Sequence, residues 1–186
     1  MNLSGMDLSA AQFDQTTIFS FLNPNTGQQQ GVNLSGTNAT LTGLTGMIDF
    51  RGVNLAGVSF SASDLSIAQF DQTTIFSFLD PNSGQQQGVN LSGTNAMLTG
   101  LSGNIDFRGV NLAGVSFTNS ELSSAQFDQT TIFSFLDPYT GQQQGVNLSG
   151  TNAMLTGLSG NTDFRGVNLA GVSFSASDLS GAQFDQ

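Results

Sequence analysis

The residues of this chain that could carry acid–base chemistry are almost all carboxylates. The sequence contains 13 Asp and Glu residues, three arginines and no His, Cys or Lys. Without His, Cys or Lys, the common pairs of nucleophile and general base are excluded, as is Schiff-base chemistry, and zinc lacks its preferred ligands. Two carboxylates could still act together, but the acids recur in nearly every repeat of the chain, and an active site is rarely repeated in this way. We therefore expect a protein that is not an enzyme and binds no cofactor.

The spacing of the acids does not suit a metal ion either. Calcium requires several converging oxygen ligands, as in loops of the form D-x-D-x-D-G, and no stretch of the sequence has that spacing. Asp49 and Arg51 flank Phe50, so an extended backbone places both side chains on the solvent side, next to one another. A surface ion pair of this kind contributes little to stability. We expect no metal site among these residues.

Charge and composition narrow the classes of partner. The formal net charge is −10, and only 9% of the residues are charged. A negative balance opposes direct binding to nucleic acid or anionic lipid, because both need Lys and Arg to neutralise phosphates. The 16 Phe residues distinguish the chain from a disordered polar tract, which lacks aromatic side chains to bury.

Neither a secretory signal nor a membrane span is expected. The first residues, MNLSGMDLSAAQF, lack a basic segment followed by an apolar one. No run approaches the ~18 apolar residues of a membrane-spanning helix. The sequence therefore predicts no membrane insertion and leaves the compartment open, with the cytoplasm and the extracellular surface both compatible.

The whole chain is a tandem repeat. The motif AQFDQ recurs at intervals of 57 residues (68 − 11), at residues 11–15, 68–72, 125–129 and 182–186. We predict a single solenoid domain over residues 1–186. It consists of a partial copy at residues 1–12 and full copies at 13–69, 70–126 and 127–183. The near identity of the copies indicates recent tandem duplication or an engineered array.

A shorter period lies inside each copy, where an apolar residue occurs at every fifth position. If each five forms a short strand and a corner, alternation points this residue and the one two before it inward, and small residues suit the corner. Stacked coils then hydrogen-bond to one another, as in a solenoid. The core residues predicted in this way are Phe50, Leu55, Phe60, Leu65, Phe70, Ile75, Phe107, Leu112, Phe117, Leu122, Phe127, Ile132, Phe164, Leu169, Phe174, Leu179 and Phe184.

This pattern resembles the pentapeptide-repeat family, whose consensus is A-(D/N)-L-x-x. The segment VNLAG, at residues 53–57, 110–114 and 167–171, is close to that consensus. The resemblance implies a right-handed quadrilateral β-helix with four fives in each coil, and about three coils for each copy. Residues one coil apart then stack face to face. The expected stacks are Phe50 over Phe70, Phe107 over Phe127 and Phe164 over Phe184.

Two places break the five-residue frame. One extra residue falls near Met47, and again near Asn104 and Asn161, where we expect a bulge or a widened corner. The larger break is FSFLDPNSGQQQG at residues 76–88, which contains the turn signal Asp-Pro-x-x-Gly. We predict a protruding loop or small hairpin over residues 78–88. The alternative is an irregular face with Leu79 inside.

Loops on a rigid scaffold often carry binding sites. We therefore predict a possible protein-binding surface on these loops, with a functionally neutral insertion as the alternative. The candidate interaction residues are Asp80, Pro81, Gln85, Gln86, Gln87, Asp137, Pro138 and Tyr139.

Three functions fit these observations. The first is a structural or interaction scaffold, because no capping segment is visible and open β edges invite pairing, so the rod is expected to associate end to end into a fibre or to be part of a longer repeat protein. The resemblance implies a second, since some family members mimic DNA and bind DNA gyrase. The rod is expected to carry about one net negative charge per ~5 Å of its length, against one per ~1.7 Å for duplex DNA, which weakens the case for DNA mimicry. The third is a surface adhesin or an ice-binding solenoid, which would use flat rows of Thr. Thr16 and Thr17 recur only once per copy, too sparsely for a regular row.

Overall fold

The computed structural model describes residues 1–186 except Gln15, Tyr139 and Gln186. The described part contains twelve strands of three residues each and no helix. The strands are β1 (Ser20–Leu22), β2 (Gln29–Gly31), β3 (Thr40–Thr42), β4 (Ser59–Ser61), β5 (Ser77–Leu79), β6 (Gln86–Gly88), β7 (Met97–Thr99), β8 (Ser116–Thr118), β9 (Ser134–Leu136), β10 (Gln143–Gly145), β11 (Met154–Thr156) and β12 (Ser173–Ser175).

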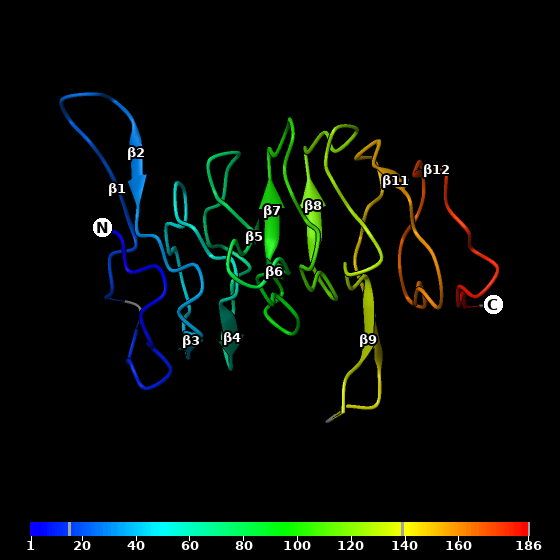
Figure 1. The fold of residues 1–186 in the computed structure, drawn as a ribbon, viewed down its shortest axis with the longest axis horizontal. Helices are drawn as coiled ribbons and strands as arrows, with labels where there is room; N and C mark the ends of the chain where they lie inside the picture. The colour runs from blue at the N-terminus through cyan, green and yellow to red at the C-terminus, as the bar shows by residue number, and fades with distance from the viewer. Residues whose placement is uncertain (15, 139, 186) are drawn as a thin grey trace.

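Two kinds of pairing join these strands. Strands β1–β2, β5–β6 and β9–β10 are antiparallel hairpins. Strands β3–β4, β7–β8 and β11–β12 are parallel pairs. Because parallel strands cannot be joined by a tight turn, the backbone travels a full coil before it returns beside itself. Figure 1 shows these coils side by side along a rod, with the N-terminus at the left and the C-terminus at the right.

Backbone hydrogen bonds link one coil to the next at four positions. In the first copy these are Asn33 with Asn54, β3 with β4, Leu44 with Asp64, and Asp49 with Gln69. Paired residues lie 19 to 21 positions apart (59 − 40 and 54 − 33). The predicted all-β solenoid is therefore confirmed. Its right-handed winding and square outline stay predictions.

The number of coils in a copy differs from the expected three. The series of backbone pairings through Asn33, which we call a ladder, continues to Asn54 and Ile75. Asn90 is the counterpart of Asn33, 57 residues on (90 − 33), yet it pairs with Ser59 on the neighbouring ladder. A copy therefore fills two complete coils and then advances by one more ladder, which we call one side of the coil. Equivalent residues move to the next ladder from one copy to the next.

The hairpins account for this difference. Ser59 and Asn90 are separated by 31 residues (90 − 59), whereas Asn33 and Asn54 are separated by 21 (54 − 33). The additional residues leave the coil between Ser59 and Asn90 and form the β5–β6 hairpin. The prediction of three coils was wrong because it assigned hairpin residues to the coil.

Stacked Phe side chains run through the centre of the solenoid. The ring centroids of Phe50 and Phe70 lie 5.4 Å apart, with an angle of 23° between the ring planes. Phe107 and Phe127 repeat both values, and the corresponding pair of the third copy lies at 5.3 Å and 17°. All three predicted stacks are confirmed. Offset aromatic pairs of this kind contribute beyond the area that they bury.

Burial follows the five-residue pattern over most of the expected core. The side chains exposed by 8% or less are Phe50, Leu55, Phe60, Leu65, Phe70, Phe107, Leu112, Phe117, Leu122, Phe127 and Phe164. Leu169 and Leu179 are partly buried. Phe174 and Phe184, on the last coil that the structure describes, are 37% and 51% exposed.

Ile75 and Ile132 differ from the expectation, being 45% and 44% exposed. Beside Ile75, the buried side chains are Thr74 and Phe76, at 4% and 1% exposure. Alternation is thus displaced by one residue, because the larger Phe ring gains more from burial than Ile does. The Thr74 hydroxyl is satisfied inside, since it donates to the Phe50 carbonyl at 3.0 Å. The prediction was wrong here because counting in fives does not decide between two adjacent apolar residues.

The extra residue near Met47 forms a widened corner, as predicted. The Ile48 N–H donates to the Gly46 carbonyl at 3.0 Å, which closes a tight turn centred on Met47. Gly46 has φ of 91°, a conformation that favours glycine. The Met47 side chain is 74% exposed, so the insertion is accommodated outside the core.

Candidate interaction surface

Each copy carries one hairpin that leaves the coil. In the second copy Phe78 lies opposite Gln87 in the β5–β6 pair. Leu79, at the outer end of β5, is 60% exposed. The predicted hairpin over residues 78–88 is therefore confirmed, and Leu79 does not lie inside.

Asp80 organises the tip of this hairpin. Its carboxylate accepts hydrogen bonds from the Asn82 N–H at 2.9 Å and the Ser83 hydroxyl at 2.8 Å. The backbone hydrogen bond from Asn82 is the main reason why the pKa of Asp80 lies below its ordinary value. The Asp80 N–H also donates to the Gln85 carbonyl at 2.9 Å. Pro81 and Gln85 are exposed, so they form the accessible part of the tip.

Gln86 and Gln87 fasten the hairpin to the solenoid. Gln86 Nε2 donates to Ser77 Oγ at 2.6 Å and to Asp106 Oδ2 at 3.1 Å. Gln87 Oε1 lies over Gly57, 3.1 Å from where a Cβ would be. Gln86 therefore reaches the coil that follows, and Gln87 reaches the coil that precedes. These contacts tie the base of the hairpin to both neighbouring coils.

The third hairpin repeats this arrangement where it is described. Gln143 Nε2 donates to Ser134 Oγ at 2.7 Å, as Gln86 does to its serine. Asp137 is partly buried and Pro138 is exposed. The remaining candidate on this loop, Tyr139, lies outside the described residues.

An Asp–Arg pair lies beneath each hairpin. Arg51 donates through Nε and Nη2 to the Asp49 carboxylate at 2.9 and 2.8 Å, side by side as predicted. Gln29 of the first hairpin donates to the same carboxylate at 3.0 Å. Burial alone would raise the pKa of Asp49, but the hydrogen bonds from Arg51 and Gln29 outweigh it. The pKa of Asp49 therefore lies below its ordinary value.

We expect Asp49→Asn to lower stability at neutral pH and to weaken its dependence on pH. Because the pKa of Asp49 is lower in the folded state, its carboxylate stabilises the fold above the unfolded-state pKa, and this contribution is lost as pH falls through the folded-state pKa. The loss at pH 7 should be about 1 kcal/mol or less, since the pair is partly exposed. Urea unfolding at pH 7 and at a pH below 3 measures it. Equal losses at both values would contradict this explanation.

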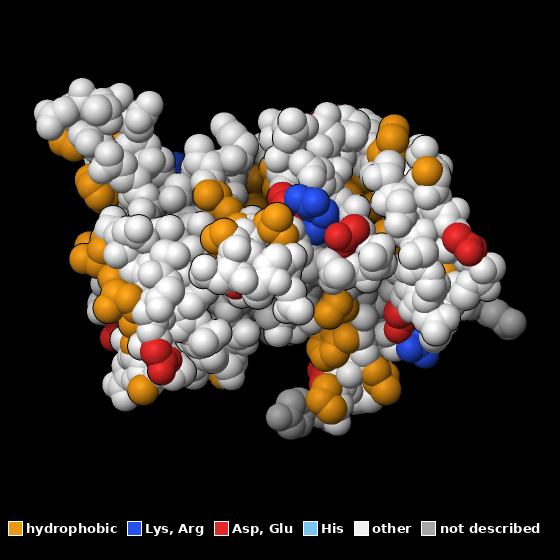
Figure 2. Space-filling view, in the orientation of Figure 1, with side chains coloured by type: hydrophobic (Ala, Val, Ile, Leu, Met, Phe, Trp, Pro, Cys, Tyr) orange, Lys and Arg blue, Asp and Glu red, His pale blue; other side chains and the backbone are white. Residues whose placement is uncertain are grey.

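The hairpins point to different sides of the rod. Because equivalent residues move to the next ladder in each copy, the hairpins move around the rod as well. In Figure 1, β1–β2 points to the top and β9–β10 to the bottom, while β5–β6 lies across the middle. Figure 2 shows apolar side chains gathered on the upper left and lower hairpins. The large exposed apolar residues on and beside the hairpins are Ile18, Phe21, Leu22, Ile75, Leu79, Ile132 and Leu136.

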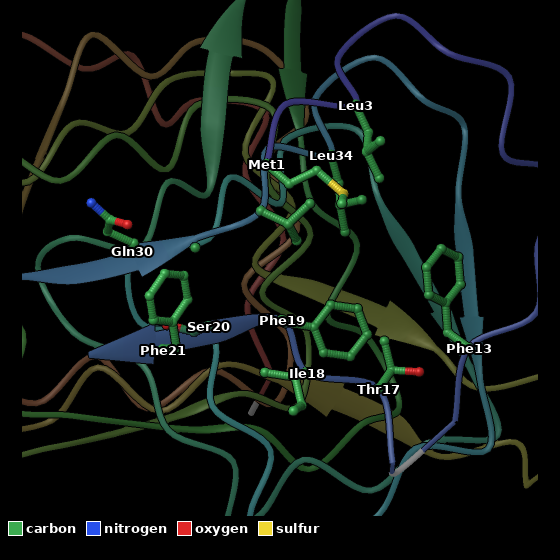
Figure 3. Close-up of a pocket in the computed structure, with 12 residues that line it drawn as sticks. Met1, Leu3, Phe13, Thr17, Ile18, Phe19, Ser20, Phe21, Gln30 and Leu34 are labelled. Atoms are coloured by element: carbon green, nitrogen blue, oxygen red, sulfur yellow. The ribbon is translucent and has the colours of Figure 1, made fainter. Parts of the chain in front are cut away.

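An apolar pocket of about 250 Å³ lies at the N-terminal end, beneath the first hairpin. Figure 3 shows Phe19 facing Met1 and Leu34 across it, with Ile18 and Phe13 beside them. A pocket with this lining suits an apolar occupant, because burying an unpaired polar group there would be unfavourable.

Two of these residues have counterparts inside the chain that are less exposed. Ile18 is 82% exposed, whereas Ile75 in the next copy is 45% exposed. Phe21 is 51% exposed, whereas its counterpart Phe78 is partly buried. The cover in the second copy is the preceding coil, in which the Leu55 N–H donates to the Ile75 carbonyl at 2.8 Å. The pocket therefore marks the place that a preceding coil occupies inside the chain.

Side chains that could ligate a metal ion are not clustered in the described residues. These residues contain no group of three or more His, Cys, Asp or Glu side chains that could hold a metal. In the same part of the chain, every buried side-chain nitrogen or oxygen has a hydrogen-bond partner. Nor is there, in the ranges 1–14, 16–138 and 140–185, a helix with the length and hydrophobicity to cross a membrane.

Sequence reasoning missed the end pocket and the fastening role of two glutamines. Gln86 and Gln87 were predicted as interaction residues, but Gln86 donates to Asp106 of the next coil and the side-chain oxygen of Gln87 lies against Gly57. The spacing could have indicated the Gln86 contact, because Gln86 and Asp106 are 20 residues apart and residues one coil apart lie next to each other. The pocket depends on which of two apolar neighbours points inward, which the spacing does not resolve.

Known proteins resemble this chain to different degrees. A family model described as pentapeptide repeats matches residues 103–132 and 160–186. QnrB1, described as a plasmid-mediated fluoroquinolone resistance protein, is 22% identical over 79% of this chain and 74% of its own, with a TM-score of 0.33. HetL of Nostoc sp. strain PCC 7120, a pentapeptide repeat protein involved in heterocyst differentiation regulation, is 17% identical over 81% of this chain and 65% of its own, with a TM-score of 0.24. No curated protein sequence matches the chain.

The matched segments are the stretches in which the fives run without a hairpin. Residues 46–75 have nearly the same sequence as the matched residues 103–132. The family match thus falls on the same five-residue repeats that form the coils. In residues 103–132 and 160–186, the chain matches the pentapeptide-repeat family.

Proposed function

We propose that this chain is a non-enzymatic scaffold, a rod of stacked coils that joins further coils through its end faces and presents hairpins on its sides. The joining coil comes from a second copy, which gives a fibre, or from adjoining sequence in a longer repeat protein. Coil edges are suited to this role because they carry unpaired backbone N–H and C=O groups that recruit another strand.

The observation that carries this proposal is the difference in exposure between equivalent residues. At the N-terminal end, Ile18 is 82% exposed against 45% for Ile75. At the other end, Leu169 is only partly buried, whereas its counterpart Leu112 has no exposed surface. The two end faces thus expose opposite sides of a contact that recurs inside the chain.

The hairpins supply a second kind of surface, directed at a protein partner. Leu79 and Leu136 are 60% and 57% exposed, so they remain open even where coils are stacked. Since the hairpins move around the rod, a rigid partner that lies on one side meets one hairpin at a time. Repeated copies then raise the number of partners bound rather than the affinity for one of them.

Electron microscopy over a concentration series tests the joining of coils. We expect stacks or filaments that lengthen with concentration, and shorter ones at equal concentration for Ile18→Asp, because the joint would cover part of a charged side chain. Leu22→Asp is the matched control, since Leu22 is 61% exposed and its counterpart Leu79 stays 60% exposed inside the chain. Short rods of the unsubstituted chain at every concentration would refute self-joining.

A further inference from the structure

The two ends of the polypeptide hold versions of the same segment. Residues 1–15 and 172–186 are both counterparts of the interior segment 58–72. Residues 172–186 differ from the interior segment at one position, where Gly181 replaces Ile67. Residues 1–15 differ from it at six positions. The last segment is thus the closer copy of the interior one.

A joint that reproduces the interior contact has room for only one of these segments. Inside the chain, residues 58–72 run between the coil of Leu55 and the hairpin base at Ile75, filling all the intervening sides. At a joint, residues 172–186 of one copy and residues 1–15 of the next would occupy that same position. One of them has to leave.

The first segment is the less firmly held of the two candidates. Met1 and Met6 are 86% and 52% exposed. Leu3 stands where the interior has Phe60, which is 7% exposed, so the first segment has the smaller side chain to bury at that position. Residues 172–186 keep the Phe at this place, as Phe174.

We propose that copies of this chain join by exchange, with residues 172–186 of one copy replacing residues 1–15 of the next. This inference rests on the proposed function, in which end faces join coils. The exchange brings AQFDQ of residues 182–186 directly before TTIF of residues 16–19. The joint then reads AQFDQTTIF, the sequence found inside the chain at residues 68–76.

Backbone groups at the two ends match those paired inside. In the interior, the Leu55 N–H donates to the Ile75 carbonyl at 2.8 Å, and the Ile75 N–H donates to the Val53 carbonyl at 2.9 Å. The counterpart of Leu55 in the last coil is Leu169, and the counterpart of Ile75 in the first hairpin is Ile18. The exchange places Leu169 of one copy beside Ile18 of the next, so both hydrogen bonds can form.

A side-chain contact is matched in the same way. In the interior, Gln87 Oε1 lies 3.1 Å from the Cβ position of Gly57. Gln30, the counterpart of Gln87, is exposed. Gly171, the counterpart of Gly57, has no described atom within 4 Å of its Cβ position. The exchange brings this glutamine and this glycine together.

Apolar surface of the last coil is covered by the exchange. Phe174 and Phe184 are 37% and 51% exposed, whereas their interior counterparts Phe60 and Phe70 are 7% and 6% exposed. Residues 172–186 would gain this cover while keeping their own packing on the preceding coil. Burial of these two Phe side chains favours the joint.

Stacking without exchange predicts a different neighbour for Ile18. If residues 1–15 stayed in place on top of the last coil, Asn2 would follow Gln183 and lie over Asn168. Ile18, three sides further on, would then lie over Gln183. With exchange, Ile18 lies over Asn168, as Ile75 lies over Asn54 inside the chain. The two arrangements are therefore distinguished by one residue pair.

Disulfide trapping of the full chain separates these arrangements, because the sequence contains no Cys. The variants Ile18→Cys and Asn168→Cys would be mixed, oxidised and resolved on a non-reducing gel, with each variant alone as the background. The double variant Asn54→Cys/Ile75→Cys is the positive control, since these residues are bridge partners within one chain. Asn111→Cys is the matched negative control, because Asn111 already has Ile132 beside it.

We expect the Ile18→Cys and Asn168→Cys mixture to form a cross-linked dimer well above the background. Hydrogen exchange should also become faster in residues 1–15 on association. A cross-link of Ile18→Cys with Gln183→Cys instead would overturn the exchange and leave end-to-end stacking intact. Cross-linking of neither pair, with short rods in the microscope, would overturn both the exchange and self-joining.

Discussion

Gly88→Ala should destabilise the chain by about 3 kcal/mol, the upper part of the range for overpacking a close contact. A Cβ at Gly88 would lie 2.2 Å from the carbonyl carbon of Gly109, 2.3 Å from its oxygen and 2.4 Å from the nitrogen of Val110. All three are backbone atoms of the following coil, so no side chain can rotate away. The hairpin base or the coil must move instead, which would also strain the hydrogen bonds that Gln86 makes.

Urea unfolding followed by circular dichroism measures this loss of stability. Gly84→Ala in the same hairpin is the matched control, because its Cβ would meet no described atom within 4 Å. Gly84 has φ of 68°, so this control carries only the cost of a left-handed alanine, about 1 kcal/mol. If the two variants lost the same free energy of unfolding, close packing of the hairpin base on the coil would be refuted.

Phe107→Ala should cost about 3–5 kcal/mol, the range for removing a buried Phe. Phe107 has no exposed surface, and its ring lies 5.3 Å from Phe76, 5.6 Å from Phe117 and 5.4 Å from Phe127. These neighbours belong to successive parts of the coil, so the substitution opens a cavity where the Phe stack is continuous. Because coils contact only their neighbours, the loss should be concentrated at the middle of the rod.

Differential scanning calorimetry and urea unfolding test this prediction. Phe184→Ala is the control at the end of the stack, where the ring is 51% exposed and packs on Phe164 at 5.3 Å. Its loss should be about 1 kcal/mol, since little apolar area is removed from the core. We also expect Phe107→Ala to separate the thermal transition into two steps, whereas a single sharp transition with a loss below that of Phe184→Ala would contradict the continuous core.

The movement of equivalent residues to the next ladder determines how the hairpins of an array are distributed around the rod. Because a copy takes up two coils and one further side, each added copy turns its hairpin onto the next ladder. An array of such copies would display hairpins around its whole circumference. A copy of three whole coils would have placed every hairpin on one side, and a partner could then have bridged several of them.

Much of the coil could be predicted from the sequence, because its period is local. A small residue, a polar residue and an apolar residue in each five determine which side chains point inward, whatever lies further along the chain. Phe50, Leu55 and Phe60 were identified as core in this way, and the Phe50–Phe70 stack followed from the coil length. The hairpin was likewise marked by Asp80 and Pro81.

The candidate interaction surface was less predictable, because its features depend on contacts between distant residues. Ile75 and Phe76 are adjacent apolar residues, and the five-residue spacing does not show which of them points inward. Phe76 is the buried one because its ring packs against Phe107. From the sequence, Gln86 is a loop residue like its neighbours. Its hydrogen bond to Asp106, 20 residues further on, becomes apparent only in the folded chain.

By itself, the sequence determined a strand-only solenoid without His, Cys or Lys, since five-residue alternation and composition are properties of the chain alone. The tertiary structure decided how many sides a copy fills, where the hairpins point and which end residues lie open. Those features depend on the register between coils, as the pairing of Ser59 with Asn90 illustrates. Register is settled by packing and hydrogen bonding between residues far apart in the chain, which no local pattern records.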